Sequence, residues 1–146
     1  MRQPGCPLCE GEGGRLVLRT PAWRLIHAAE PGFPGFYRLV WNDHVPEFSD
    51  LPRPARVECM DVLAAAESCL RQHLQPAKVN LAALGNMVPH LHWHLIARYP
   101  WDSRFPAPVW AAPTRAGDPA READIERRLP ALEDDFRRHL GGEAVP

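Results

Sequence analysis

Five short apolar segments predict the strands of a β-sheet. Their residues are mainly β-branched, aromatic or leucine, and segments rich in Pro, Gly or Asn separate most of them. Such a composition is typical of strands bounded by turns. The segments cover residues 15–19, 23–27, 36–41, 78–84 and 90–98. Only a short connection separates the last two, so we expect them to pair as a hairpin.

Two longer segments have the periodicity of helices. Residues 52–74 follow the N-cap candidates Ser49 and Asp50 and carry apolar side chains on one face. A second, highly charged helix is expected over about 122–140, where Pro130 should kink or split it. About five strands with one long helix and one C-terminal helix predict an α+β domain with a mostly antiparallel sheet.

The composition fits one small domain and argues against two classes of partner. The 146 residues are 45% hydrophobic, which is enough for a core. The formal net charge is −1, so no basic excess favours nucleic-acid binding. We see no apolar stretch long enough to cross a membrane and no secretory signal at the N-terminus. We therefore expect a cytoplasmic protein without a membrane partner.

The four cysteines fall into two groups. In a reducing cytoplasm they are not expected to form disulfides. Cys59 and Cys69 lie in the helical pattern and fit buried core positions. Cys6 and Cys9 have the spacing of zinc ligands but supply only half of a site. A redox pair or two incidental thiols explain this spacing equally well, although the glycine-rich segment that follows is unlike a thioredoxin-type helix.

Three of the seven histidines lie in the segment His90-Leu91-His92-Trp93-His94. On a strand, side chains alternate between faces, so the three histidines would share one face at spacings of about 6.6 Å. A single histidine there would most simply be a half-buried polar residue. Three aligned imidazoles gain little without a charge or metal to bind, and they repel one another below about pH 6.5. The pattern therefore indicates a chemical site.

Two kinds of chemistry suit such a row of imidazoles. A neutral imidazole is a good nucleophile for phosphorus when its other ring nitrogen donates a hydrogen bond that fixes the tautomer. A neighbouring imidazole can then bind a phosphate oxygen or protonate the leaving group. Zinc binding is the alternative, since histidine is a common zinc ligand.

The histidine segment resembles the signature of the histidine triad (HIT) family of nucleotide hydrolases and transferases. The similarity covers roughly Cys6 to Trp101 and includes Val79-Asn80-Leu81, Gly85-Asn86, Arg98 and an apolar strand that ends at His44. It implies a HIT-like fold, usually a homodimer, over residues 1–110. Residues 111–146 would then add a Pro-rich segment and the charged helix.

The resemblance also implies an activity, that of the bacterial branch similar to dinucleoside polyphosphate hydrolases. Family members cleave at the α-phosphate of dinucleoside polyphosphates, nucleoside phosphoramidates or adenylylated compounds, through a covalent nucleotidyl-histidine. The nucleophile would be His92, and His94 would contact the phosphate and assist the leaving group. Asn80 and Asn86 would bind the substrate. Met87 stands where many members carry a hydroxyl that reaches the leaving group, and methionine cannot donate a hydrogen bond.

A structural zinc site is implied in the same way. Some bacterial proteins of this family bind zinc through a cysteine pair, the histidine that ends the strand and the first triad histidine. Here these residues are Cys6, Cys9, His44 and His90, a closed Cys2His2 set. Zinc would leave the other two triad histidines for chemistry.

Two other functions remain compatible with the sequence. One is a nucleotide-binding protein with negligible turnover, which is compatible with methionine instead of a hydroxyl residue at position 87. The other is a zinc-stabilised interaction domain in which every histidine serves metal binding or packing. The Pro-rich segment with Trp101 and Trp110 either wraps a dimer partner, shapes the substrate pocket or is an ordinary tail. Asp102 and Arg104 of this segment are further candidates for substrate contact.

Overall fold

The computed structural model describes residues 1–141 and 143–144, and its centre is an antiparallel sheet. The strand order is β4-β5-β3-β2-β1-β6. The strands are β1 (Arg15–Arg19), β2 (Trp23–His27), β3 (Phe36–Trp41), β4 (Lys78–Ala82), β5 (His92–Arg98) and β6 (Glu143–Ala144). The predicted α+β class and its five strands are confirmed, and the two-residue β6 adds a short edge pairing with β1.

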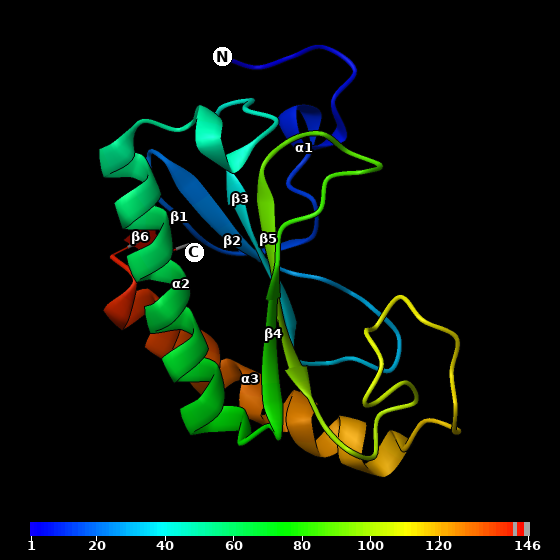
Figure 1. Ribbon diagram of the computed structural model, residues 1–146. Helices are drawn as coiled ribbons and strands as arrows, with labels where there is room; N and C mark the ends of the chain where they lie inside the picture. Colours follow the sequence, from blue (N-terminus) through cyan, green and yellow to red (C-terminus); the bar gives the residue numbers. More distant parts are fainter. Residues whose placement is uncertain (142, 145–146) are drawn as a thin grey trace.

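Two long helices cover one face of the sheet (Figure 1). They are α2 (Arg53–Leu74) and α3 (Pro119–His139), while α1 (Pro7–Glu10) is a single turn and η1 (Phe48–Asp50) a short 3-10 helix. The helix α3 begins three residues before the predicted start, because Asp118 caps it by accepting a hydrogen bond from the Arg121 backbone N–H. It continues through Pro130, so of the two predicted outcomes, a kink or a split, the split does not occur.

Packing explains why α3 tolerates an internal proline. Its apolar residues Leu129, Leu132 and Phe136 are buried in the same core as α2 and the strands. Burial of each such side chain contributes about 1.5–3 kcal/mol, which offsets the hydrogen bond lost at Pro130. The predicted core positions Cys59 and Cys69 of α2 are buried as well.

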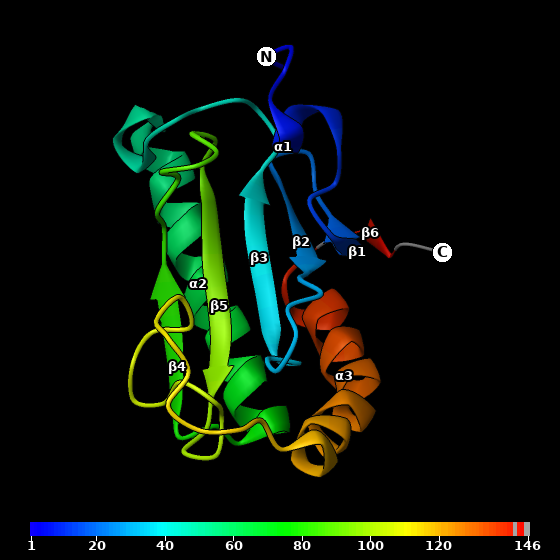
Figure 2. The same cartoon turned by 90° about the vertical axis from the view of Figure 1, so that its right-hand side faces the viewer.

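The other face of the sheet is framed by two irregular segments. Figure 2 shows α1 at one end of this face and the Pro-rich loop of residues 99–118 at the other, with the middle of β3 and β5 between them. In the described part of the chain, no helix is long and apolar enough to cross a membrane.

The Pro-rich loop is fastened to the sheet by the buried residue Asp102. This carboxylate accepts hydrogen bonds from the Arg98 guanidinium at 2.9 Å and from the backbone N–H groups of Tyr99, Arg104 and Phe105 at 3.2, 3.0 and 2.7 Å. Charge-assisted bonds of this kind fix backbone geometry. Asp102 therefore organises the loop, and both of its oxygens accept hydrogen bonds within it.

Candidate active site and metal centre

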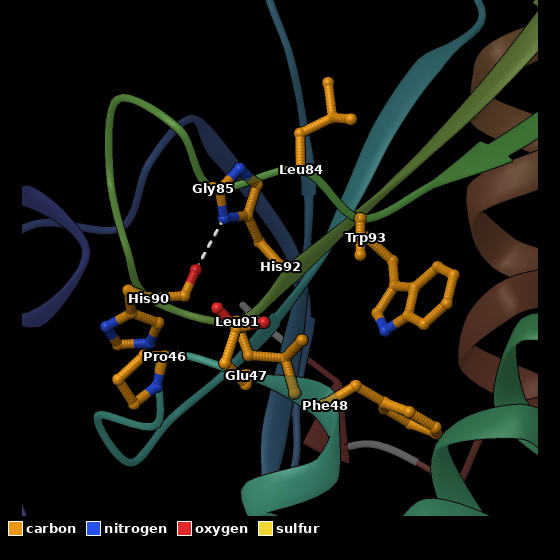
Figure 3. A pocket seen from close by; sticks show the side chains of 10 residues that line it. Pro46, Glu47, Phe48, Leu84, Gly85, His90, Leu91, His92 and Trp93 are labelled. Atoms are coloured by element: carbon orange, nitrogen blue, oxygen red, sulfur yellow. Dashed lines mark hydrogen bonds between the residues drawn. The ribbon is translucent and has the colours of Figure 1, made fainter.

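The strand β5 brings two of the triad histidines to the open face of the sheet. It lies between β3 and β4 and pairs with both. Figure 3 shows His92 and Trp93, neighbours on this strand, pointing away from each other, as the alternation predicts. The strand begins at His92 and not at residue 90 as predicted, because the chain at His90 turns: its N–H donates to the Val88 carbonyl at 2.8 Å.

His92 is held in one tautomer by the backbone. Its Nδ1 lies 2.6 Å from the carbonyl oxygen of His90 (Figure 3). A carbonyl only accepts, so Nδ1 carries the proton and donates, which leaves the lone pair on Nε2. Burial and the nearby charge of Arg38 hold the pKa of His92 below its usual value. At neutral pH this ring is therefore uncharged, with a free nitrogen.

His94 is oriented by Arg38, its cross-strand partner on β3. The Arg38 Nε donates to His94 Nδ1 over 3.3 Å, so the ring proton of neutral His94 resides on Nε2. The His94 ring packs edge-on against His92, with centroids 5.0 Å apart. Burial, His92 and Arg38 together lower the pKa of His94 to about 4. His94 thus offers an N–H donor beside the free nitrogen of His92.

The depressed pKa of His94 predicts a loss of stability in acid. The unfolded chain protonates this histidine near pH 6.5, but the folded protein does so only near pH 4. The contribution of His94 to the free energy of unfolding therefore falls as the pH drops from about 6.5 to about 4, by about 3 kcal/mol. Denaturant titrations should show a smaller acid loss in His94→Asn than in the parent protein. An equal loss in both would contradict the assignment.

A cavity of about 370 Å³ opens beside the two histidines. Its walls come from α1, β3, β5, the connection between β4 and β5, and the Pro-rich loop. The lining residues are Pro7, Leu8, Arg38, Leu84, Gly85, Asn86, Met87, Val88, His92, His94 and Trp110. The predicted residues His92, His94 and Asn86 thus line one and the same cavity.

The predicted substrate residue Asn80 lies elsewhere. Its Oδ1 accepts a hydrogen bond from the Arg98 Nη1 at 2.9 Å. It lines a neighbouring groove of about 520 Å³, and Trp110 lines both this groove and the cavity. Sequence reasoning missed Arg38 and left Trp110 open, because their positions depend on strand register and on the path of the Pro-rich loop.

The four predicted zinc ligands converge on one point beneath α1. The Sγ of Cys6 lies 3.4 Å from His90 Nδ1, and the Sγ of Cys9 lies 3.5 Å from the Nδ1 atoms of both His90 and His44. All four ligand atoms lie within 4.8 Å of one another. Zinc–sulfur bonds of about 2.3 Å and zinc–nitrogen bonds of about 2.0 Å imply sulfur–nitrogen separations of about 3.5 Å in a tetrahedron. The cluster matches that spacing.

The orientation of His90 also fits a metal ligand. Its ring is fully buried, and burial lowers its pKa, so it is neutral. Its Nε2 lies 2.6 Å from the Trp41 carbonyl and donates to it. The Nδ1 lone pair therefore faces the two sulfurs. A hydrogen bond from the distal ring nitrogen to a fixed acceptor is typical of metal-bound histidines.

The remaining histidines, for which the sequence offered no partner, have partners in the structure. His27 Nε2 donates to the Pro34 carbonyl at 2.7 Å. His73 and His139 both contact Asp135, on the helix-covered side of the sheet. None of these three histidines lies in the cavity lining.

Comparison with known proteins agrees with this geometry. The sequence model of the HIT domain family matches residues 12–101. A histidine triad protein from Bradyrhizobium japonicum is 26% identical, with a TM-score of 0.70 over 88% of this chain and 92% of that one. One from Marinobacter aquaeolei VT8 is 24% identical, with a TM-score of 0.71 over 93% and 98%.

A zinc-bound histidine triad family protein from Mycobacterium smegmatis has the same fold. Its TM-score is 0.61 at 18% identity, over 92% of this chain and 96% of that one. No curated protein matches the chain significantly.

Proposed function

The chain belongs to the HIT domain family, and we propose that it is a nucleotidyl hydrolase or transferase with His92 as nucleophile. One observation carries the proposal. The hydrogen bond from His92 Nδ1 to the His90 carbonyl leaves Nε2 unprotonated beside a cavity of about 370 Å³. A free imidazole nitrogen at such a site is suited to attack a phosphorus atom.

The reaction would proceed in two displacements. The Nε2 of His92 attacks the α-phosphorus, the bond from phosphorus to the leaving group breaks, and a nucleotidyl-histidine forms. The Nε2–H of His94 and the Arg38 guanidinium, which both line the cavity, would stabilise the charge on the phosphate oxygens. Asn86 offers an amide from the facing loop. Water or another acceptor then attacks the same phosphorus and frees His92.

The direct test is a rapid-quench experiment. The protein is mixed with each compound of a panel of adenylylated compounds, the reaction is quenched, and the mass of the intact protein is measured by mass spectrometry. A mass increase of one nucleoside monophosphate is expected. If no compound gives either an adduct or free monophosphate, the protein is a nucleotide binder without turnover.

We also propose that the four-residue cluster under α1 binds one structural zinc ion. The ligands would be Cys6, Cys9, His44 and His90, whose spacing and buried donor set fit the metal. Bound zinc would tie α1 to the start of β5. Because Pro7 and Leu8 of α1 line the cavity, this tie also holds one wall of the active site.

A second copy of the chain is the expected partner. The strand β4 is the sheet edge opposite β6, so one side of its backbone has no strand partner among the described residues. Exposed apolar side chains lie on this strand and on the neighbouring helix α2, namely Leu81, Val57 and Met60. We propose a homodimer through this edge, since unpaired strand edges beside exposed apolar side chains favour association.

The lining of the cavity favours an apolar leaving group. Among the described residues, Arg38 is the only charged side chain that lines it. Every further phosphate of a polyphosphate chain would need positive or N–H partners there. Met87 and Trp110, exposed by 95% and 52%, instead present a thioether and an indole. We infer a nucleoside monophosphate joined to an apolar or aromatic group, as in a phosphoramidate of an aromatic amine.

This inference predicts a substrate preference that depends on Trp110. We expect kcat/KM for an adenosine phosphoramidate of tryptamine to exceed that for diadenosine triphosphate by at least about tenfold. Trp110→Ala should lower the first value by roughly tenfold, about 1.4 kcal/mol, and leave the second nearly unchanged. Trp101, stacked on Tyr99 outside the cavity, provides the matched control Trp101→Ala. Equal losses for both substrates would contradict a role in leaving-group selection.

A further inference from the structure

A second group of metal-binding side chains lies between the two long helices. We call it the α2–α3 cluster: Cys69 and His73 of α2, and Asp135 and His139 of α3. Each helix contributes two residues spaced four apart, so each pair lies on one helix face. The helices α2 and α3 pack closely on each other, and these two faces meet.

The contacts of Asp135 show how closely the group converges. The Asp135 side chain is only 8% exposed. It accepts a hydrogen bond from His73 Nε2 at 2.9 Å, and His139 Nδ1 lies 2.6 Å from its other oxygen. The ligand atoms of Cys69, Asp135 and His139 all lie within 4.8 Å of one another. A buried carboxylate is thus surrounded by one thiol and two imidazoles.

The donor atoms of this cluster suit a divalent cation, which would take over from the two histidines as partner of the Asp135 carboxylate. The nearest guanidinium, that of Arg138, is 3.7 Å away on a side chain that is 69% exposed, so it screens the buried charge weakly. A thiolate from Cys69 and the carboxylate together would neutralise two positive charges. The neutral imidazole of His139 would complete three converging ligands of sulfur, oxygen and nitrogen, a set that zinc accepts together with a water molecule. His73 lies outside this group of three and holds the other oxygen of the carboxylate.

We propose that the α2–α3 cluster is a second site for a divalent transition metal of the zinc type. Binding replaces the proton on the Cys69 sulfur and the proton that His139 Nδ1 shares with Asp135, and these protons leave to solvent. The His139 side chain is 63% exposed, so its ring can adjust and the ion can enter from that side. A bound ion would clamp α3 to α2 on the side of the sheet away from the active site.

Metal counting in matched variants tests this site separately from the one beneath α1. Native mass spectrometry of the parent protein in excess zinc should show two ions per chain. Cys6→Ser/Cys9→Ser and Cys69→Ala should each show one, and the triple variant none. Cys59→Ala, which removes a buried α2 thiol outside both clusters, should keep two.

Cobalt provides an independent readout. In the Cys6→Ser/Cys9→Ser protein, cobalt(II) should produce a thiolate-to-metal charge-transfer absorption that Cys69→Ala abolishes. Asp135→Asn should weaken cobalt binding at least about tenfold, because it removes one of the two charged ligands. A zinc stoichiometry that Cys69→Ala leaves unchanged from the parent protein, or a cobalt spectrum unchanged by Cys69→Ala, would overturn the proposal. Far-ultraviolet circular dichroism of each variant identifies any that fails to fold.

Discussion

Replacing His92 with alanine is expected to reduce release of nucleoside monophosphate by at least about 10³-fold and to abolish the covalent adduct. The reason is that Nε2 of this ring is a free nitrogen at the cavity, while the Nδ1 of His94 is taken up by Arg38. A rapid-quench mass measurement gives the adduct, and chromatography of the same samples gives the monophosphate.

His92→Asn separates the nucleophile from the hydrogen bond. An asparagine amide can still donate to the His90 carbonyl, but it has no nucleophilic nitrogen. We expect this variant to fold like the parent protein and to be as inactive as His92→Ala. His27→Gln, which alters a histidine outside the cavity lining, should retain activity. If His92→Asn still gained the mass of one nucleoside monophosphate, another residue would be the nucleophile.

The strands and helices were predictable because each has a local pattern of apolar and polar residues in the sequence. The alternation of His92, Trp93 and His94 places histidines on one face and an apolar ring on the other. In the structure both histidines line the cavity, while Trp93 packs against the core. Errors arose where contacts outside the pattern decide. The strand β5 starts at His92 and not at residue 90 because the His90 N–H turns to Val88 and the Leu91 N–H donates to the distant Val45 carbonyl. The continuity of α3 through Pro130 depends on the core beneath it.

The candidate site was predictable only in part, for a related reason. The residues of the histidine segment and of the Cys/His cluster beneath α1 can be recognised in the sequence. The contact of Arg38 with His94 cannot, because it depends on the register of β3 against β5. Asn80 has the residue type of a substrate ligand, yet its amide oxygen is bound by Arg98. Trp110 reaches the cavity because Asp102 folds the loop that carries it, and no periodic pattern encodes that fold.

Removing one cysteine of the proposed zinc site is the second change with a large expected effect. Cys6→Ser should lower bound zinc by one ion per chain and the free energy of unfolding by roughly 4 kcal/mol. The helix α1 has only four residues and gains little stability by itself. Without the metal, the buried ring of His90 would lose its charged partner next to the start of β5. Zinc analysis and denaturant titration measure the two effects.

The matched control is Cys59→Ala, which deletes a fully buried thiol that belongs to neither cluster. It should cost about 1 kcal/mol, the value typical of a small core truncation, and leave the zinc content unchanged. An unchanged zinc content in Cys6→Ser would contradict the ligand assignment. Activity adds a further distinction: because Pro7 and Leu8 line the cavity, Cys6→Ser should raise KM even where the protein stays folded. His92→Ala, by contrast, removes the chemical step itself, so zinc loss and nucleophile loss have different kinetic signatures.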